Sequence, residues 1–298
     1  MTAFRSGFVT VVGRPNVGKS TLVNRLVGTK VTITSDRPQT TRSEVRGVRT
    51  NQSVSQIVFL DTPGLHKPRT ALGERTNQRA LATLAEVDVI CHLIDAAAAI
   101  GPGDRFVADI VHRVETPSVL VVNKVDSVGK VAIGDHLATA AAELGDYDAF
   151  VPLSAKTGAG TDALVDELEA RLPEGPAYYP EGVVTDQPET FLAAEILREK
   201  LIAVTRDELP HSITVACEVD DDEDARADLL RLRATVRVER ESQKGIVIGR
   251  GGAVLKAAGS EARRELEALL GTRIHLETRV RVERDWQRRP ASLDRLGY

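Results

Sequence analysis

Short apolar runs alternate with amphipathic stretches through the first part of the chain. The apolar runs are rich in β-branched residues and lie at 8–13, 56–61, 88–95, 117–124 and 147–154. Patterns with apolar residues at three- and four-residue intervals occupy 103–114, 131–144 and 161–171. Buried strands that alternate with helices predict a mostly parallel sheet, an α/β domain with helices on both faces. Residues 29–55 are polar and loop-like and then predict an edge strand.

The composition and the hydrophobic pattern of the sequence change at about residue 172. Residues 172–189 contain four prolines and predict an extended, semi-rigid linker. The linker is followed by a helix (189–205) and two strands (211–219 and 232–241). After a short helical stretch come a second long helix (253–270) and a last strand (273–284). This order predicts a smaller α+β domain. We therefore expect three parts, which are 1–172, the linker 173–188, and 189–298.

Composition narrows the class of protein. The 298 residues are 42% hydrophobic and 28% charged, which is typical of a soluble globular chain. The apolar runs are too short to span a membrane, and the N-terminus does not resemble a secretory signal. Cys91 and Cys217 stand singly in apolar runs, which indicates buried thiols in a reducing compartment.

Charge is segregated along the chain. The net charge of −4 argues against indiscriminate binding of nucleic acid but allows a local basic surface. Residues 218–228 carry seven acids and one arginine, which is typical of a solvated loop, whereas residues 273–298 carry seven arginines and four acids.

The stretch "GRPNVGKS" (13–20) follows an apolar run and opens a helical pattern, as a phosphate-binding P-loop requires. Gly13 and Gly18 let the backbone curl so that its N–H groups point inward, and the helix N-terminus adds its dipole. Lys19 would reach the β- and γ-phosphates, and the Ser20 hydroxyl would bind Mg²⁺. The motif predicts a nucleoside triphosphate site.

Three further motifs, each at the end of a predicted strand, indicate guanine. "DTPG" (61–64) supplies an Asp for the metal and a Gly64 N–H for the γ-phosphate. In "NKVD" (123–126) Asp126 can accept bonds from the guanine N1–H and amine. In "SAK" (154–156) the Ala155 N–H can meet guanine O6. Ligands bind at this edge of an open α/β sheet. The predicted GTP-binding residues are Gly13, Arg14, Pro15, Asn16, Val17, Gly18, Lys19, Ser20, Thr21, Asp61, Thr62, Pro63, Gly64, Asn123, Lys124, Asp126, Ser154, Ala155 and Lys156.

These motifs resemble those of the P-loop GTPases, and the resemblance covers 8–170. It places the first switch at "RPQTTR" (37–42) and implies that Thr41 binds the metal, with Thr40 as the alternative. The implied Mg²⁺ ligands are Ser20, Thr41 and Asp61. The residues with implied catalytic roles are Lys19, Thr41, Gly64 and Asn16.

Leu65 stands where GTPases of the Ras type place the glutamine that orients the attacking water. Leucine cannot orient water, so hydrolysis needs another form of help. By resemblance to related GTPases, Asn16 holds a potassium ion near the phosphates; the alternative is that Asn16 only stabilises the loop.

A second glycine-rich stretch, "GIVIGRGG" (245–252), has no Lys-Ser/Thr after its glycines and no G-x-G-x-x-G pattern. A G-x-x-G between helical stretches of a small α+β domain is instead the KH pattern, which clamps the backbone of unpaired nucleotides. Ile246, Val247, Ile248, Val254 and Leu255 would floor the groove. The residues predicted to bind RNA are Lys244, Ile246, Ile248, Gly249, Arg250, Gly251, Gly252, Val254 and Lys256.

From end to end the chain resembles the Era-type bacterial GTPases, which join a P-loop GTPase domain to a C-terminal type II KH domain. The segments that carry this resemblance include "FLAAEILREKL", "ELPHSITV", "VERESQKGIVIGRGG" and "EARRELEALLG". The resemblance implies binding to the 3′ end of 16S ribosomal RNA and a role in maturation of the small ribosomal subunit. It also implies a monomer in the cytoplasm, with a peripheral place at the inner face of the membrane, although no basic amphipathic helix marks one here.

Two functions remain open from the residues. In the first, GTP orders 32–43 and 62–80, and these segments change the availability of the RNA groove. In the second, the GTPase regulates a protein partner through its C-terminal domain. An ATP-dependent kinase is disfavoured by "NKVD" and by the lack of a base for an acceptor substrate.

Overall fold

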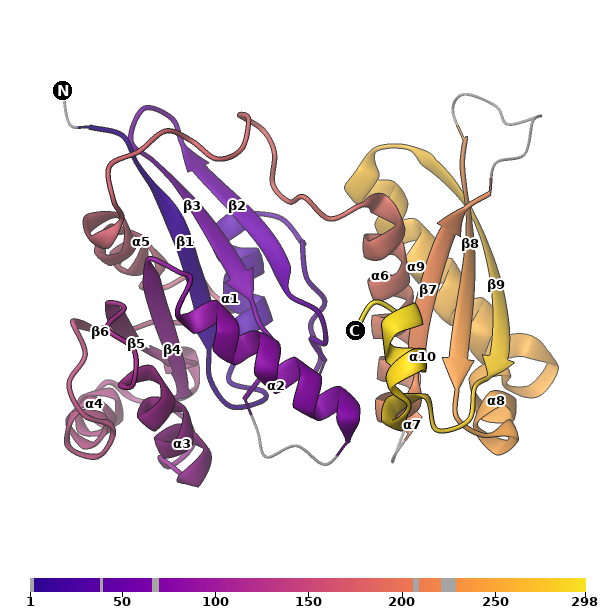
Figure 1. Cartoon of the computed structure of the whole chain (residues 1–298), viewed down its shortest axis with the longest axis horizontal. Coiled ribbons are helices and arrows are strands. Elements are labelled where there is room, and N and C mark those ends of the chain that lie inside the picture. The colour runs from indigo at the N-terminus through magenta and orange to yellow at the C-terminus, as the bar shows by residue number, and fades with distance from the viewer. Residues whose placement is uncertain (1–2, 38–39, 66–69, 206–208, 221–228) are drawn as a thin grey trace. The chain divides into compact units, whose positions relative to one another are not determined.

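The computed structural model describes residues 3–37, 40–65, 70–205, 209–220 and 229–298. Pro38 and Gln39 of the predicted first switch, and most of the acidic segment, lie outside these ranges. The chain forms two compact units. Unit 1 comprises 1–32, 38–69 and 73–186, and unit 2 comprises 33–37, 70–72 and 187–298. Each unit is built on its own sheet (Figure 1).

The sheet of unit 1 is mostly parallel, as the sequence predicts. Its strands are β1 (Arg5–Val12), β2 (Val45–Asn51), β3 (Ser55–Asp61), β4 (Val89–Asp95), β5 (Ser118–Asn123) and β6 (Ala149–Pro152). They lie in the order β2-β3-β1-β4-β5-β6. β2 is the predicted edge strand and is antiparallel to β3, while the other pairs are parallel.

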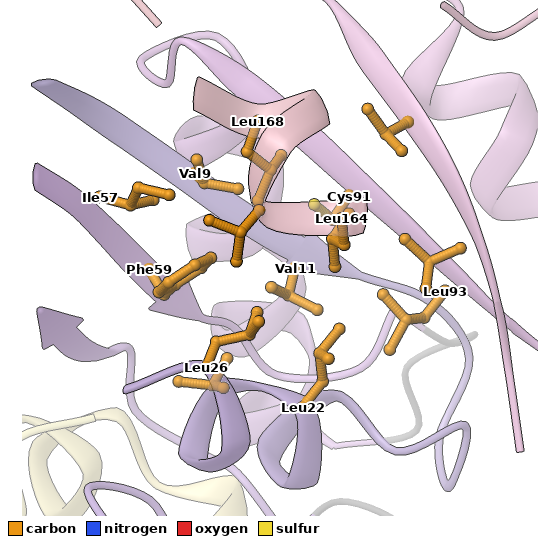
Figure 2. Close-up of a cluster of buried hydrophobic side chains, with 14 of the residues drawn as sticks. Val9, Val11, Leu22, Leu26, Ile57, Phe59, Cys91, Leu93, Leu164 and Leu168 are labelled. Atoms are coloured by element: carbon orange, nitrogen blue, oxygen red, sulfur yellow. The ribbon is translucent and has the colours of Figure 1, made fainter. Parts of the chain in front are cut away.

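Helices cover both faces of this sheet because the strands are apolar on both sides. The helices are α1 (Lys19–Val27), α2 (Ala71–Leu84), α3 (Pro102–Val111), α4 (Lys130–Leu144) and α5 (Thr161–Arg171). α1 and α5 pack on one face, where Leu22, Leu26, Leu164 and Leu168 meet strand residues such as Phe59 (Figure 2). α2, α3 and α4 cover the other face. The segment 62–80, which we expect GTP to order, is helical from Ala71 onward because it contains the first part of α2.

The register brings the ends of the strands together. Val11 of β1 pairs with Asp61 of β3, and Asp95 of β4 pairs with Asn123 of β5. Each predicted nucleotide motif therefore begins at the carboxyl edge of the same sheet. The strand order reverses on the two sides of β1, which is where open α/β sheets bind ligands.

The predicted linker is largely part of unit 1. The Ser6 N–H donates to the Pro173 carbonyl (3.1 Å), and the Val48 N–H donates to the Val184 carbonyl (2.8 Å). The Gln56 side-chain carbonyl accepts the N–H groups of Tyr178 and Tyr179. Residues 173–186 thus run along unit 1 as an extended strap. The sequence shows the extended conformation, but not the backbone groups that fix it.

Unit 2 has the predicted order α-β-β-α-α-β. Its elements are α6 (Glu189–Val204), α7 (Leu209–Ser212), β7 (Thr214–Val219), β8 (Leu229–Val238), α8 (Glu241–Ile248), the 3-10 turn η2 (Arg250–Gly252), α9 (Ala253–Leu270), β9 (Arg273–Val282), the 3-10 turn η3 (Trp286–Arg288) and α10 (Pro290–Arg295). The sheet order is β7-β8-β9, with β8 and β9 parallel. α6, α8 and α9 supply the helical side of its core.

Two boundaries in unit 2 differ from the sequence prediction. The predicted strand at 211–219 begins only at Thr214, because Leu209–Ser212 form a helical turn that contains Pro210. The C-terminal segment also contributes to the core, which its sequence does not predict. There Trp286, Leu293 and Tyr298 are buried, and the Trp286 indole N–H donates to the Ser212 carbonyl. Within the described residues, no helix is both long and apolar enough to cross a membrane.

His92 is a fully buried histidine in the middle of β4. Its Nδ1 lies 2.7 Å from the Tyr147 hydroxyl, and among the described residues its Nε2 has no hydrogen-bond partner. Burial, with smaller contributions from the charges of His112 and Lys19, lowers the pKa of His92 to about 3. Unit 1 therefore holds this imidazole in its neutral form.

We expect unit 1 to lose stability as the pH falls from about 6.5 toward 3, because only the unfolded chain takes up a proton at His92 there. The loss is about 1.4 kcal/mol per pH unit, or about 2.7 kcal/mol at pH 4.5. Urea unfolding at pH 7 and pH 4.5, followed by circular dichroism, measures this loss of stability. Tryptophan fluorescence would not report on unit 1, because the sole tryptophan, Trp286, lies in unit 2. His92→Gln should flatten the pH dependence relative to His275→Gln, whose side chain is exposed on β9. Equal pH slopes in the two variants would contradict this expectation.

Candidate functional sites

The P-loop leaves β1 and enters α1 through backbone conformations that favour glycine. Gly18 has φ 101°, and a Cβ atom there would lie 2.3 Å from the Asn123 amide nitrogen. Asn16 has φ 66°, a left-handed conformation that asparagine adopts more readily than most residues. Thr21 lies in the first turn of α1, and Val17 is buried in the core. The predicted phosphate loop is therefore a tight turn packed against the "NKVD" strand.

Arg14 of this loop forms an ion pair that the sequence did not indicate. Its Nε lies 3.0 Å from Oδ1 of Asp104, a residue in the first turn of α3 that is only 1% exposed. Asp104 also accepts the Gly101 N–H through Oδ2 (3.0 Å). The carboxylate thus caps α3 and holds the P-loop. Asp104 resembles an ordinary helix cap in the sequence, and only the fold places it beside Arg14.

Lys19 occupies the place expected for a phosphate-binding lysine. Its Nζ donates to the Gly13 and Arg14 carbonyls, at 3.2 Å each. A Cβ atom on Gly64 would lie 3.1 Å from this Nζ, so the "DTPG" glycine is adjacent to the ammonium. Burial lowers the pKa of Lys19 to about 8, and the Asp61 carboxylate partly opposes the shift. Anionic phosphates beside it would favour the charged lysine.

The predicted metal ligands converge on Asp61. The Ser20 hydroxyl donates to Asp61 Oδ2 at 2.7 Å and lies 3.0 Å from the Thr41 hydroxyl, which in turn lies 3.3 Å from the same oxygen. A further hydroxyl, that of Thr32, donates to Asp61 Oδ2 at 2.8 Å. Thr32 lies in no motif, so the sequence does not indicate its place in this cluster. Of the two candidate threonines, Thr41 has its hydroxyl at Ser20 and Asp61, so the geometry favours it.

Asp61 is buried, and this burial raises the pKa of its carboxyl, while hydrogen bonds from Ser20 and Thr32 oppose the rise. Its second oxygen, Oδ1, is buried and has no hydrogen-bond partner among the described residues. Hard oxygen donors around a carboxylate with an unsatisfied oxygen suit Mg²⁺. The residues therefore fit the divalent metal that accompanies a nucleoside triphosphate.

The other "DTPG" residues turn inward. The Thr62 hydroxyl donates to the Val11 carbonyl (3.1 Å), and Pro63 is buried. Leu65 is 2% exposed and packs in the core beneath α2 and α3. Leu65 thus contributes to packing, which agrees with the expectation that it does not orient water.

The "NKVD" motif braces the P-loop and the "SAK" loop. Asn123 Nδ2 donates to the Val17 carbonyl (2.8 Å), while its Oδ1 accepts the Ala155 N–H (2.9 Å). The Ala155 N–H is also predicted to contact guanine O6. It would then have to share its hydrogen between O6 and Asn123 Oδ1, or give up its bond to Asn123. Lys124 Nζ donates to the Asn16 carbonyl (2.8 Å) and to Asp95 Oδ2 (2.7 Å). Asp95 ends β4 and, like Thr32 and Asp104, is a residue that no motif in the sequence indicates.

Asp126, the residue expected to recognise the base, is exposed at the end of the "NKVD" motif. The Ser154 hydroxyl donates to its Oδ1 at 2.6 Å, and this hydrogen bond lowers the pKa of Asp126. The carbonyl of Lys156 accepts Arg25 Nη2 (2.5 Å), which ties the "SAK" loop to α1. The arrangement keeps an ionised acceptor available for two N–H donors.

The second glycine-rich stretch is a helix–turn–helix, in which α8 ends at Ile248, η2 forms the turn, and α9 begins at Ala253. Gly249 has φ 74°, and a Cβ atom there would lie 2.5 Å from Val254 Cγ2. Gly251 (φ 60°) and Gly252 (φ 79°) are also left-handed. A Cβ atom on Gly251 or Gly252 would meet no atom within 4 Å, so these two glycines leave the backbone of the turn open to close approach by a ligand.

The side chains around this turn divide into two groups. Ile246 is 56% exposed, Arg250 and Lys256 are exposed, and Lys244, Ile248 and Val254 are half-buried. Val247 is fully buried in the core of unit 2, and Leu255 packs against that core. The expectation that Val247 lines the groove is therefore wrong, because successive residues of a helix face different directions and this one faces the core. Leu255 is partly exposed, and its place at the groove stays a prediction.

Comparisons with known proteins cover both units. A family model described as "50S ribosome-binding GTPase" matches residues 8–124, and a KH domain model matches 208–287. The GTPase Era of Mycobacterium avium is 50% identical over 300 residues, which is all of each chain. The GTPase Era of Mycobacterium tuberculosis is 49% identical over 301 residues, again all of each chain.

Two solved structures share the whole fold. One is Era in complex with MgGDPNP and nucleotides 1506–1542 of 16S ribosomal RNA, at 40% identity and a TM-score of 0.95 over 99% of each chain. The other is a variant of Aquifex aeolicus Era bound to GDP and AlF₄⁻, at 40% identity and a TM-score of 0.95 over 99% of each chain.

We expect Asp126→Asn to weaken GTP binding by about ten- to hundredfold, because the neutral amide loses two charge-assisted acceptor bonds. The same variant should gain affinity for xanthosine triphosphate, whose base offers a carbonyl where guanine has an amine. Equilibrium binding of both nucleotides measures the exchange. Asp162→Asn, at an exposed position of α5, is the control. Unchanged preference for GTP in Asp126→Asn would show that another residue recognises the base.

Proposed function

This chain belongs to the Era family of GTPases, and we propose that it is a GTP-switched RNA-binding protein that binds 16S ribosomal RNA near its 3′ end and assists maturation of the small ribosomal subunit. The observation that carries the proposal is the joining, in one chain, of a complete guanine-nucleotide site to a KH unit with an open glycine turn. A relative of the same fold holds MgGDPNP and 16S ribosomal RNA together. The likeness to that relative extends over both units.

GTP hydrolysis is the activity of this family, and the P-loop, "DTPG", "NKVD" and "SAK" supply its parts. We assign Lys19 to the β- and γ-phosphates and the Gly64 N–H to the γ-phosphate, because the two are adjacent in the structure. Ser20 and Thr41 would hold Mg²⁺ through their hydroxyls, and Asp61 would hold it through a bound water. The bound ion would neutralise the charge that the triphosphate carries.

The attacking water needs help that Leu65 cannot give, since this side chain is buried in the core. We propose that a potassium ion near Asn16 supplies the additional positive charge at the phosphates. The left-handed backbone of Asn16 and the anchoring of its carbonyl by Lys124 support the proposal, because they fix the backbone of this residue within the loop. The alternative is that Asn16 serves only to keep the loop in shape.

We expect turnover to be several-fold slower in sodium than in potassium at equal ionic strength, measured as phosphate release under saturating GTP. Asn16→Gly tolerates the same left-handed backbone but lacks the side chain, so its rate should be equal in the two salts. Equal rates for the native chain in sodium and potassium would show that potassium does not take part in hydrolysis.

We propose that RNA binds at the turn between α8 and α9. Glycine φ values and open space around Gly251 and Gly252 allow the sugar-phosphate backbone to approach, and Arg250 supplies an exposed charge. Ile246, the most exposed of the groove residues, offers an apolar surface to an unstacked base. The turn carries no lysine–hydroxyl pair for a triphosphate, which favours a diester strand as its ligand.

We expect the double substitution Arg250→Asp and Gly251→Asp to weaken binding of a 16S 3′-end oligonucleotide by at least about tenfold. Aspartate is tolerated in the left-handed conformation of Gly251, where a Cβ meets no atom within 4 Å, so the fold should persist. The matched control is Lys130→Asp with Gly134→Asp on exposed α4, which changes the charge equally and also places a Cβ in open space. Equal RNA affinity of the two double variants would favour a protein partner for unit 2.

The nucleotide state should alter RNA affinity if the segments 32–43 and 62–80 respond to GTP, as in other switches of this class. Ribosome assembly places the proposed work in the cytoplasm. A monomeric state and a peripheral place at the membrane stay predictions from the family resemblance.

A further inference from the structure

Thr32 is a hydroxyl of the metal-binding cluster that belongs to no GTPase motif. Its side chain is 4% exposed and donates to Asp61 Oδ2 at 2.8 Å. Ser20 and Thr41 would bind Mg²⁺, but Thr32 has no such assignment. All four residues belong to unit 1, so the cluster lies within one unit.

Asn24 of α1 fixes the backbone that carries this hydroxyl. Its Oδ1 accepts the N–H groups of Val31 (2.9 Å) and Thr32 (3.0 Å), and its Nδ2 donates to the Thr32 carbonyl (2.8 Å). Val31 also packs in the core of unit 1. A hydroxyl on a backbone that is held in this way keeps one direction, and little conformational freedom is lost when it donates to Asp61.

The helix α1 therefore reaches Asp61 by two routes. Ser20 and Asn24 are about one turn apart and lie on the same face of the helix. Ser20 donates to Asp61 Oδ2 itself, and Asn24 holds the loop whose threonine donates to the same oxygen. The helix that begins at the P-loop lysine thus helps to set the direction of the carboxylate at the end of β3.

Thr32 differs from the other two hydroxyls in what a metal ion would demand of it. A hydroxyl that binds Mg²⁺ must place its oxygen on the ion, so the metal would set the positions of Ser20 and Thr41. The bond from Thr32 to Asp61 has no such demand on it and can persist with and without the ion. It compensates a fully buried carboxylate and leaves Oδ1, which has no hydrogen-bond partner among the described residues, available.

We propose that Thr32 is a positioning residue of the metal site, which holds Asp61 through Oδ2 while Asn24 holds Thr32. The inference rests on the proposed role of Asp61 at the metal. Thr32 acts through the carboxylate and does not itself bind the ion. Loss of its hydroxyl should therefore weaken Mg²⁺ binding. Metal-free binding of the nucleotide should persist, because the P-loop amides and lysine contact the phosphates without the ion.

The test measures equilibrium binding of a fluorescent non-hydrolysable GTP analogue to the full chain, over a range of Mg²⁺ concentrations and in EDTA. Thr32→Val replaces the hydroxyl by a methyl group and should raise the Mg²⁺ concentration for half-maximal binding about tenfold, with affinity in EDTA within about twofold. Thr32→Ser keeps a hydroxyl and should restore the native Mg²⁺ dependence. Thr10→Val is the matched control, because Thr10 is a fully buried threonine whose hydroxyl has no hydrogen-bond partner among the described residues.

A double variant separates a positioning role from a direct bond to the metal. In an Asp61→Ala background, Thr32→Val should cause no further change in the Mg²⁺ dependence, because the carboxylate that it positions is gone. A further rise of about tenfold in that background would show that Thr32 binds the ion itself and would overturn the inference. A native Mg²⁺ dependence of the single variant Thr32→Val would overturn it as well.

Asn24→Ala tests the same inference if Thr32→Val does not fold. This variant releases the backbone of Thr32, so it should also raise the half-maximal Mg²⁺ concentration at unchanged affinity in EDTA. A native Mg²⁺ dependence, or an equal loss of affinity with and without the metal, would count against the positioning role. If the native chain itself binds the analogue equally in Mg²⁺ and in EDTA, the proposed metal site is absent and the role of Thr32 falls with it.

Discussion

A buried carboxylate at the end of β3 organises the nucleotide site. Asp61 is removed from water, and an ionised acid in that position is unfavourable unless hydrogen bonds or a cation compensate it. Hydroxyls from three parts of the chain, Ser20, Thr32 and Thr41, gather on one of its oxygens. The P-loop, the segment after α1 and the first switch are thereby held at one point. A metal and a triphosphate would complete the compensation, which links the stability of this arrangement to the bound nucleotide.

The two glycine-rich loops use the same property of the backbone for different ligands. In the P-loop, Gly18 lies against the Asn123 amide, so the turn closes around a small, highly charged group with a lysine beside it. In unit 2, a Cβ on Gly251 or Gly252 would meet open space, so the turn faces outward. An enclosed turn with a lysine suits a triphosphate, and an open turn with an arginine suits one stretch of a polymer.

Much of the fold and the site could be predicted because the signals are local. Alternation of β-branched strands with helices identified the parallel sheet. The motifs at strand ends predicted Lys19, Ser20, Asp61, Asn123 and Asp126 as site residues, and the structure places these motifs at one edge of the sheet. What was missed has no local signal. Thr32, Asp95 and Asp104 look like ordinary loop or cap residues until the fold brings them to Asp61, Lys124 and Arg14. Val247 was assigned to the wrong side because an apolar run in a helix does not reveal which residues face the core.

The sequence by itself determined that the chain has a guanine-nucleotide site, a KH unit and an order of elements for each. Those properties follow from spacing, since a P-loop or a G-x-x-G turn needs particular residues at consecutive positions. Only the tertiary structure decided that residues 173–186 form a strap on unit 1 and that Leu72 sits among Trp286, Leu293 and Tyr298. It also decided that Glu199 holds Thr34, across a separation of 165 residues. Such contacts form between side chains that are distant in the sequence. Periodicity and motifs are local patterns, so they do not show which distant residues will meet.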